Sequence, residues 1–89
     1  MSIFNAIGRR KTSVARVYLS EGKGAFVINK RQMNEYLNNA VLKLKVVRPF
    51  AVLQLASDTF DIKVNVDGGG VNGQADAIRL GIARALIQL

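Results

Sequence analysis

The segment that decides the fold is residues 60–67, which read Phe-Asp-Ile-Lys-Val-Asn-Val-Asp. Apolar and polar residues alternate at every position. Side chains of a strand point alternately to opposite faces, so this pattern predicts a strand with one buried face and one face in water. Gly68-Gly69-Gly70 ends the strand, and a helix is predicted from about Gly73 to the end of the chain. Two apolar stripes on this helix indicate contact with two partners, such as a sheet and a neighbouring helix.

Two further strands are predicted closer to the N-terminus. Residues 13–19 alternate in the same manner, and residues 25–28 form a short apolar run. Residues 20–24 between them contain two glycines, which permit the positive φ angles of a turn. The two strands are therefore expected to pair as a hairpin.

Helices are predicted between the hairpin and residue 60. Asn29 is expected to cap a short helix that Asn38-Asn39 ends, with Met33, Tyr36 and Leu37 on its apolar side. Residues 40–56 are expected to form a helix broken or kinked at Pro49. The apolar side after the proline is formed by Phe50, Val52, Leu53 and Ala56.

The length and the charge of the chain limit the functions that it can have. Eighty-nine residues suffice for one domain, expected to span residues 1–89, and 49% of them are hydrophobic. The net charge of +7 is uneven: ten Lys and Arg against two Asp and Glu lie up to Arg48, and three against four follow. Such a basic half indicates an anionic partner. Nucleic acid is the first expectation and a membrane surface the second.

The sequence lacks the residues that several classes of chemistry require. The chain has neither cysteine nor histidine, which excludes disulfides, thiolate catalysis, zinc fingers and histidine general bases. The acidic residues show neither a metal-loop spacing nor a catalytic pair. No apolar run approaches ~20 residues, and residues 1–7 are too short for a signal peptide. We therefore expect a soluble protein that is not an enzyme, with no cofactor, no metal and no membrane contact.

The first candidate binding stretch is Gly-Arg-Arg-Lys-Thr-Ser at residues 8–13. Arginine can bind a phosphate through two hydrogen bonds, and lysine and hydroxyl groups add single donors. The predicted phosphate contacts are Arg9, Arg10, Lys11, Thr12, Ser13 and, further along the strand, Arg16. The alternative is a solvated arm or an edge strand protected by its charge.

A second basic stretch is Lys30-Arg31 at the predicted start of the short helix. Cations are mildly unfavourable there because the helix dipole is positive at that end. The pair therefore indicates a nearby anion, or only surface exposure. On the last helix, Arg79 is a further candidate.

The third stretch is the glycine loop at residues 68–74, which reads Gly-Gly-Gly-Val-Asn-Gly-Gln. Backbone N–H groups of such a loop, together with a helix N-terminus, can hold a phosphate. The candidate residues are Gly68, Gly69, Gly70, Asn72, Gly73 and Gln74. Two alternatives remain: a dinucleotide site, which would need a following strand with an acidic residue, and a tight turn in which only glycine fits.

Base stacking has little support. Phe26, Phe50 and Phe60 are expected in the core, and the sequence shows no interleaved aromatic and basic residues. Recognition of RNA is expected to rely on shape and phosphate.

These motifs together resemble one protein family. Residues 8–17 resemble the opening motif of the ninth protein of the small ribosomal subunit, in its bacterial form. Residues 28–31 resemble the end of that family's hairpin, and residues 68–86 resemble its most distinctive block. The order and spacing of the three motifs also match.

The resemblance implies a two-layer α+β fold, a small sheet with helices on one face and a left-handed β-α-β crossover, shared with the second domain of the fifth small-subunit protein. It implies ribosomal RNA and neighbouring ribosomal proteins of the subunit head as partners, on cytoplasmic ribosomes. Family members continue into a basic C-terminal extension beyond the position of Leu89, so we expect a globular core, whether natural, truncated or engineered. No transfer-RNA contact is carried over to any residue here.

Two other functions remain open. One is a nucleotide-binding domain that uses residues 68–73. The other is a folding or interaction scaffold with only residual affinity for RNA.

Overall fold

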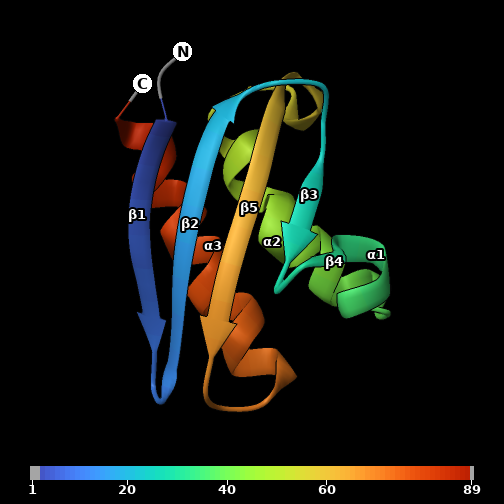
Figure 1. Cartoon of the computed structure of the whole chain (residues 1–89), viewed down its shortest axis with the longest axis vertical. Helices are drawn as coiled ribbons and strands as arrows, with labels where there is room; N and C mark the ends of the chain where they lie inside the picture. Colours follow the sequence, from blue (N-terminus) through green and yellow to red (C-terminus); the bar gives the residue numbers. More distant parts are fainter. Residues whose placement is uncertain (1–2, 89) are drawn as a thin grey trace.

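The computed structural model describes residues 3–88, which form five strands and three α-helices. In chain order the elements are β1 (Ile3–Arg10), β2 (Ser13–Glu21), β3 (Phe26–Ile28), β4 (Arg31–Gln32), α1 (Met33–Tyr36), α2 (Ala40–Val52), the 3-10 helix η1 (Ser57–Thr59), β5 (Phe60–Asp67) and α3 (Val71–Ile87). The strands form one sheet in the order β1-β2-β5-β3-β4. Figure 1 shows α2 and α3 together behind this sheet, so its front face is open. This confirms the predicted two-layer α+β fold.

Strand β5 lies in the middle of the sheet, as its sequence requires. Its apolar residues Phe60, Ile62, Val64 and Val66 are all buried beneath the helices. It pairs with β2 antiparallel on one side and with β3 parallel on the other. Backbone N–H and C=O groups that are buried need hydrogen-bond partners, and a central strand finds them on both sides. This position therefore suits a strand whose apolar face is covered by helices.

The parallel pair of β3 and β5 is joined by β4, α1 and α2. In Figure 1 both strands point downward, β3 lies to the right of β5, and α2 lies behind the sheet. The path from β3 backward through α2 and forward to β5 is therefore left-handed. This rare hand is the one that the family resemblance implies.

The core lies between the sheet and the two long helices. From α3 it receives the predicted stripe of Ala75, Ile78, Ile82, Ala85 and Leu86; Leu89, the last residue of that stripe, lies outside the described residues. From α2 it receives Leu42, Val46 and Phe50. The predicted core aromatics are buried, and the rings of Phe50 and Phe60 lie 5.8 Å apart between centroids.

The predicted hairpin of residues 13–19 and 25–28 is wrong. Strand β2 forms its hairpin with β1, which the sequence did not reveal, and β5 separates β2 from β3. The inward-facing residues of β1 include the small Ala6 and Gly8, while Ile3 and Ile7 lie on the open face. This arrangement hides the apolar alternation that identifies a half-buried strand.

The predicted helix boundaries also need correction. Asn29 does not cap a helix: its φ is +50°, and the short helix α1 begins at Met33. Asn39, which was expected to end the short helix, instead caps α2 by accepting a hydrogen bond from the Val41 N–H at 2.8 Å. Helix α3 begins at Val71, two residues before the predicted start.

Helix α2 continues through Pro49 to Val52 and is not broken there. A proline removes only one N–H from the helical pattern, and the helix ends within one turn of it. Phe50 is 2% exposed and anchors this end. The rest of the predicted apolar side is wrong, because Val52, Leu53 and Ala56 are exposed.

Candidate nucleic-acid interface

The two candidate stretches at residues 8–13 and 68–74 meet in space. Residues 11 and 12 form the two-residue turn between β1 and β2, since Arg10 pairs with Ser13. The Ser13 hydroxyl donates a hydrogen bond of 3.0 Å to the Gly68 carbonyl oxygen. Ser13 is 1% exposed, so this bond fixes the turn against the glycine loop from inside.

The glycines of the loop allow this close approach. Gly68 and Gly69 have φ angles of +79° and +64°, which favour glycine. A Cβ on Gly68 would lie 2.2 Å from the Thr12 carbonyl oxygen, and one on Gly69 would lie 2.2 Å from the Ser13 hydroxyl. The alternative of a tight turn in which only glycine fits therefore describes these two residues. Gly70 has nothing within 4 Å of a Cβ and borders open space.

A hollow of about 360 Å³ lies between the turn, the loop and the start of α3, and we name it the turn–loop cleft. Its lining contains most of the predicted contact residues. They are Arg10, Lys11, Thr12, Ser13, Gly69, Gly70, Val71, Asn72, Gly73 and Asp76.

The N-terminus of α3 forms one wall of this cleft. Its first turn carries no acidic residue, and no side chain caps it. The first N–H groups of a helix have no partner inside the helix and carry the positive end of its dipole. Lys11 and Thr12 face this end from the β1–β2 turn. The cleft thus combines a cation, a hydroxyl and helix N–H groups, which is the donor set that a phosphate accepts.

One predicted residue of the cleft, Arg10, forms an ion pair within the protein. Arg10 lies 3.8 Å from the Asp76 carboxylate, and Lys45 of α2 lies 3.1 Å from the same carboxylate. Asp76 therefore holds β1, α2 and α3 together at this corner. Lys45 was not among the predicted contact residues, because the apolar residues of 40–56 do not show from the sequence which face of α2 it occupies.

The side chain of Gln74 also forms hydrogen bonds within the protein. Its amide donates a 3.1 Å hydrogen bond to the Gly68 carbonyl oxygen and accepts one of 2.7 Å from the Tyr36 hydroxyl. The Asn29 side-chain amide donates to the same hydroxyl at 3.2 Å, and exchanges two hydrogen bonds with the Val66 backbone. A continuous set of hydrogen bonds thus joins the β3–β4 turn to the glycine loop.

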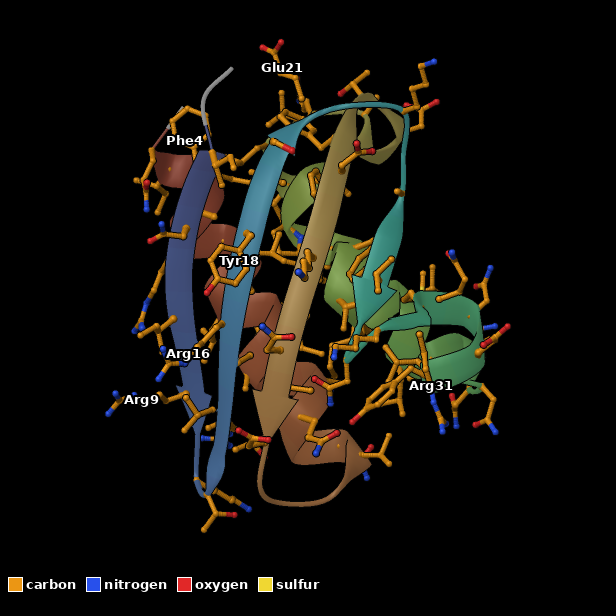
Figure 2. The ribbon with its side chains drawn as sticks, in the orientation of Figure 1. Phe4, Arg9, Arg16, Tyr18, Glu21 and Arg31 are labelled. Atoms are coloured by element: carbon orange, nitrogen blue, oxygen red, sulfur yellow. The ribbon has the colours of Figure 1, made fainter. Side chains whose placement is uncertain are left out.

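The remaining predicted cations surround this end of the molecule without entering the cleft. Arg9 and Arg16 border a second hollow of about 620 Å³ on the open face of the sheet. Lys30 and Arg31 are exposed at the β3–β4 turn, where the helix start predicted for them is replaced by a turn and strand. Figure 2 shows Arg9 and Arg31 at opposite edges of the sheet, both in the lower half of the view.

Arg79 lies elsewhere. It lines a groove between α2 and α3, together with Lys45 and Arg48. The structure thus does not bring Arg79 to the turn–loop cleft with the other candidates. Arg48, like Lys45, was not among the predicted contact residues.

The opposite end of the molecule carries acidic groups. Figure 2 shows Glu21 at the top of the view, far from Arg9 and Arg31. Nearby, Asp61 accepts hydrogen bonds from the N–H groups of Lys23 and Ala25, at 3.0 and 3.1 Å. These bonds hold the pKa of the Asp61 carboxyl below its ordinary value, because they stabilise the charged form. The charge is therefore distributed unevenly between the two ends of the sheet.

Within residues 3–88, no group of three or more His, Cys, Asp or Glu residues is placed to hold a metal ion. The helices of the same range fall short of the length and apolar character that a membrane span requires.

A single sheet with two helices on one face, a left-handed crossover and cations gathered at one end defines a small basic α+β protein. Residues 8–89 match the family description "Ribosomal protein S9/S16", and the chain belongs to this family. It is therefore a ribosomal protein with a structural role in translation, which confirms the resemblance drawn from the three motifs.

Individual relatives agree over the whole chain. The chain is 51% identical to the small ribosomal subunit protein uS9 of Parabacteroides distasonis, over all of its own length and 69% of the relative. It is 52% identical to that of Porphyromonas gingivalis, with the same coverage. With the protein of Cytophaga hutchinsonii it shares 55% identity over 98% of its own length and 67% of the relative. All three bear the name of a ribosomal protein and none that of an enzyme.

Proposed function

We propose that this chain is a one-domain structural component of the small ribosomal subunit that binds ribosomal RNA through the turn–loop cleft. The observation that carries the proposal is the convergence of Lys11 and Thr12 with the uncapped N-terminus of α3. Two stretches more than fifty residues apart in the sequence meet there, as the hydrogen bond from Ser13 to Gly68 records.

The cleft suits one phosphate of an RNA backbone. The ammonium group of Lys11 supplies charge, the Thr12 hydroxyl and Asn72 supply single hydrogen bonds, and the N–H groups of α3 supply a fixed dipole. Ser13 and Gln74 act in this proposal by fixing the loop through the Gly68 carbonyl. Gly68, Gly69 and Gly73 let the loop pack against the β1–β2 turn, and Gly70, where a Cβ would meet open space, leaves room for the RNA backbone to approach.

Cations on both sides extend the contact. Arg9 and Arg16 continue it over the open face of the sheet, and Lys30 and Arg31 form a second contact at the β3–β4 turn. Arg10 contributes from its pair with Asp76, and Arg79 from the helical side. Neighbouring proteins of the small subunit complete the set of partners, and no residue here is assigned to transfer RNA.

The proposal is tested by the salt dependence of binding. Each phosphate contact that is lost reduces the slope of log K against log salt by roughly 0.7 to 0.9. With a fragment of small-subunit head RNA, the double variant Arg9→Ala/Lys11→Ala should bind more weakly, with a slope smaller by roughly 1.5.

The matched control is Lys23→Ala/Lys63→Ala, which removes the same charge elsewhere. We expect a clearly smaller effect from the control, because neither lysine borders the turn–loop cleft or the hollow beside Arg9 and Arg16. Equal loss in both double variants would mean that only net charge matters, and the cleft assignment would be wrong.

A further inference from the structure

Helix α2 has apolar residues on two opposite sides, and only one of these sides packs against the protein. Leu42, Val46 and Phe50 follow one another at spacings of four residues and are buried in the core. Val41, Leu44 and Val52 lie on the other side, with exposed fractions of 68%, 69% and 70%. The spacings of three and eight residues place these three side chains on one face of the helix. Exposed apolar stripes of this kind mark interaction surfaces.

This exposed stripe borders the groove between α2 and α3. The groove has a volume of about 800 Å³, and α3 supplies its second wall. It is lined by Val41, Leu44, Lys45, Val47, Arg48, Ala51, Val52, Asp76 and Arg79. A groove between two helices with apolar residues along one wall fits a third helix, whose apolar side chains enter at three- and four-residue spacings.

The charges of the groove are mostly positive. Its one acidic residue, Asp76, is already paired with Lys45 and Arg10. Arg48 and Arg79 form no ion pair with any described residue. An occupant that carries carboxylates beside its apolar stripe would therefore match the groove in both hydrophobicity and charge.

We propose that the α2–α3 groove is a docking site for an acidic amphipathic segment of another protein. RNA fits this surface less well, because Val41, Leu44 and Val52 offer neither a hydrogen-bond donor nor a positive charge to a phosphate. A second copy of this chain also fits less well, because each copy carries a net charge of +7. The groove shares Arg79 with the proposed RNA contacts and Asp76 with the turn–loop cleft, but peptide docking here does not require that the cleft binds RNA.

The test uses the whole chain and a synthetic peptide of about 18 residues, long enough to form a helix. The peptide carries leucines at alternating three- and four-residue spacings and glutamates on both flanks. A matched peptide has lysine in place of every glutamate. Backbone amide NMR shifts locate the bound peptide, and fluorescence anisotropy of a labelled copy gives its affinity.

We expect the acidic peptide to shift amide signals of α2 and of α3 around Arg79, and the lysine peptide to bind far more weakly. The variant Leu44→Asn/Val52→Asn should weaken binding roughly tenfold, because both apolar anchors are lost. Arg48→Glu should lower the affinity for the acidic peptide and raise the affinity for the lysine peptide. The control Ile87→Asn removes an apolar side chain that is 79% exposed outside the groove, and should leave affinity within about twofold.

Three results would overturn the proposal. The first is equal binding of the two peptides, or shifts confined to the sheet face. The second is concentration-dependent dimerisation that Leu44→Asn abolishes, which would make a second copy the occupant. The third is displacement of the acidic peptide by the head RNA fragment together with loss of RNA affinity in Leu44→Asn, which would assign the groove to RNA. Circular dichroism of each variant shows that the fold is retained.

Discussion

Gly8 of β1 and Gly81 of α3 lie against each other with no side chain between them. A Cβ on Gly8 would lie 1.9 Å from the Ala77 carbonyl oxygen and 2.4 Å from the Gly81 nitrogen. A Cβ on Gly81 would lie 3.2 Å from the Gly8 nitrogen and 2.6 Å from a methyl group of Val17. Further along the same two elements, the Arg84 guanidinium donates to the Ile7 carbonyl oxygen at 2.7 Å. This contact sets the position of β1, and therefore of the turn that follows it.

Gly8→Ala should destabilise the protein by about 3 kcal/mol, because the added methyl group meets backbone atoms that cannot move independently. Urea denaturation followed by circular dichroism measures the change. The control is Gly70→Ala, where a Cβ has nothing within 4 Å and φ is −95°. A loss of less than about 1 kcal/mol for Gly8→Ala would mean that β1 can move away from α3 at little cost.

This contact also explains why part of the fold could not be predicted. Strand β5 and helix α3 were recognisable because each has a regular apolar pattern that burial then satisfies. Strand β1 was not, because close packing on α3 requires Gly8 on its inward face, where a large apolar residue would mark a strand. Its cations were predicted as phosphate contacts, and a solvated arm or an edge strand protected by its charge was the alternative. Local periodicity cannot reveal a strand whose burial depends on backbone contact.

Lys11→Gly should stabilise the fold and weaken RNA binding at once. Lys11 has a φ of +55°, which costs a residue with a side chain roughly 1 kcal/mol relative to glycine. Glycine removes that cost, and it also removes the ammonium group from the turn–loop cleft. We expect a gain of up to about 1 kcal/mol in the free energy of unfolding, measured in urea.

Lys11→Ala separates the two effects, because alanine keeps the unfavourable backbone conformation and loses only the charge. It should match the glycine variant in RNA affinity and in salt slope, without its gain in stability. If Lys11→Gly bound the head RNA fragment as well as the parent chain, Lys11 would have no part in the interface.

Stability should fall in acid through Asp61. Its carboxylate accepts hydrogen bonds from the Lys23 and Ala25 N–H groups, which lower its pKa in the folded state. A group with a depressed folded pKa stabilises the fold above its unfolded pKa, about 3.9 for Asp. That stability is lost as the pH falls through the lower, folded pKa.

Urea denaturation between pH 6 and pH 2 should therefore show a steeper acid loss for the parent chain than for Asp61→Asn. Asp58→Asn is the control at the same end, since the Asp58 carboxylate accepts no hydrogen bond from the described residues. Curves of equal steepness for the parent chain and Asp61→Asn would show that other groups govern the acid transition.

The cleft itself was predicted only in part. Lys11, Thr12 and the glycine loop were singled out by residue type, and the fold brings them together. The hydrogen bonds of Ser13 and Gln74 to the Gly68 carbonyl oxygen were not predictable. Ser13 lies 55 residues from Gly68, and Tyr36, which donates to Gln74, lies 38 residues from it. Hydrogen bonds between side chains far apart in sequence leave no periodic signal.

Tyr36→Phe tests whether these hydrogen bonds hold the glycine loop in place. The hydroxyl of Tyr36 donates to Gln74 and accepts from Asn29. Its removal leaves the half-buried Gln74 Oε1 without its donor, while Asn29 loses one bond and keeps those to the Val66 backbone. The expected cost is about 1 to 2 kcal/mol. If the loop depends on Gln74, amide hydrogen exchange at Gly69 and Gly70 should also accelerate beyond the change at β2.

Tyr18→Phe is the matched control, because no hydrogen bond links the Tyr18 hydroxyl to the described residues. Uniform acceleration over the whole sheet, with no excess at the loop, would mean that Tyr36 stabilises the fold globally and does not position the cleft.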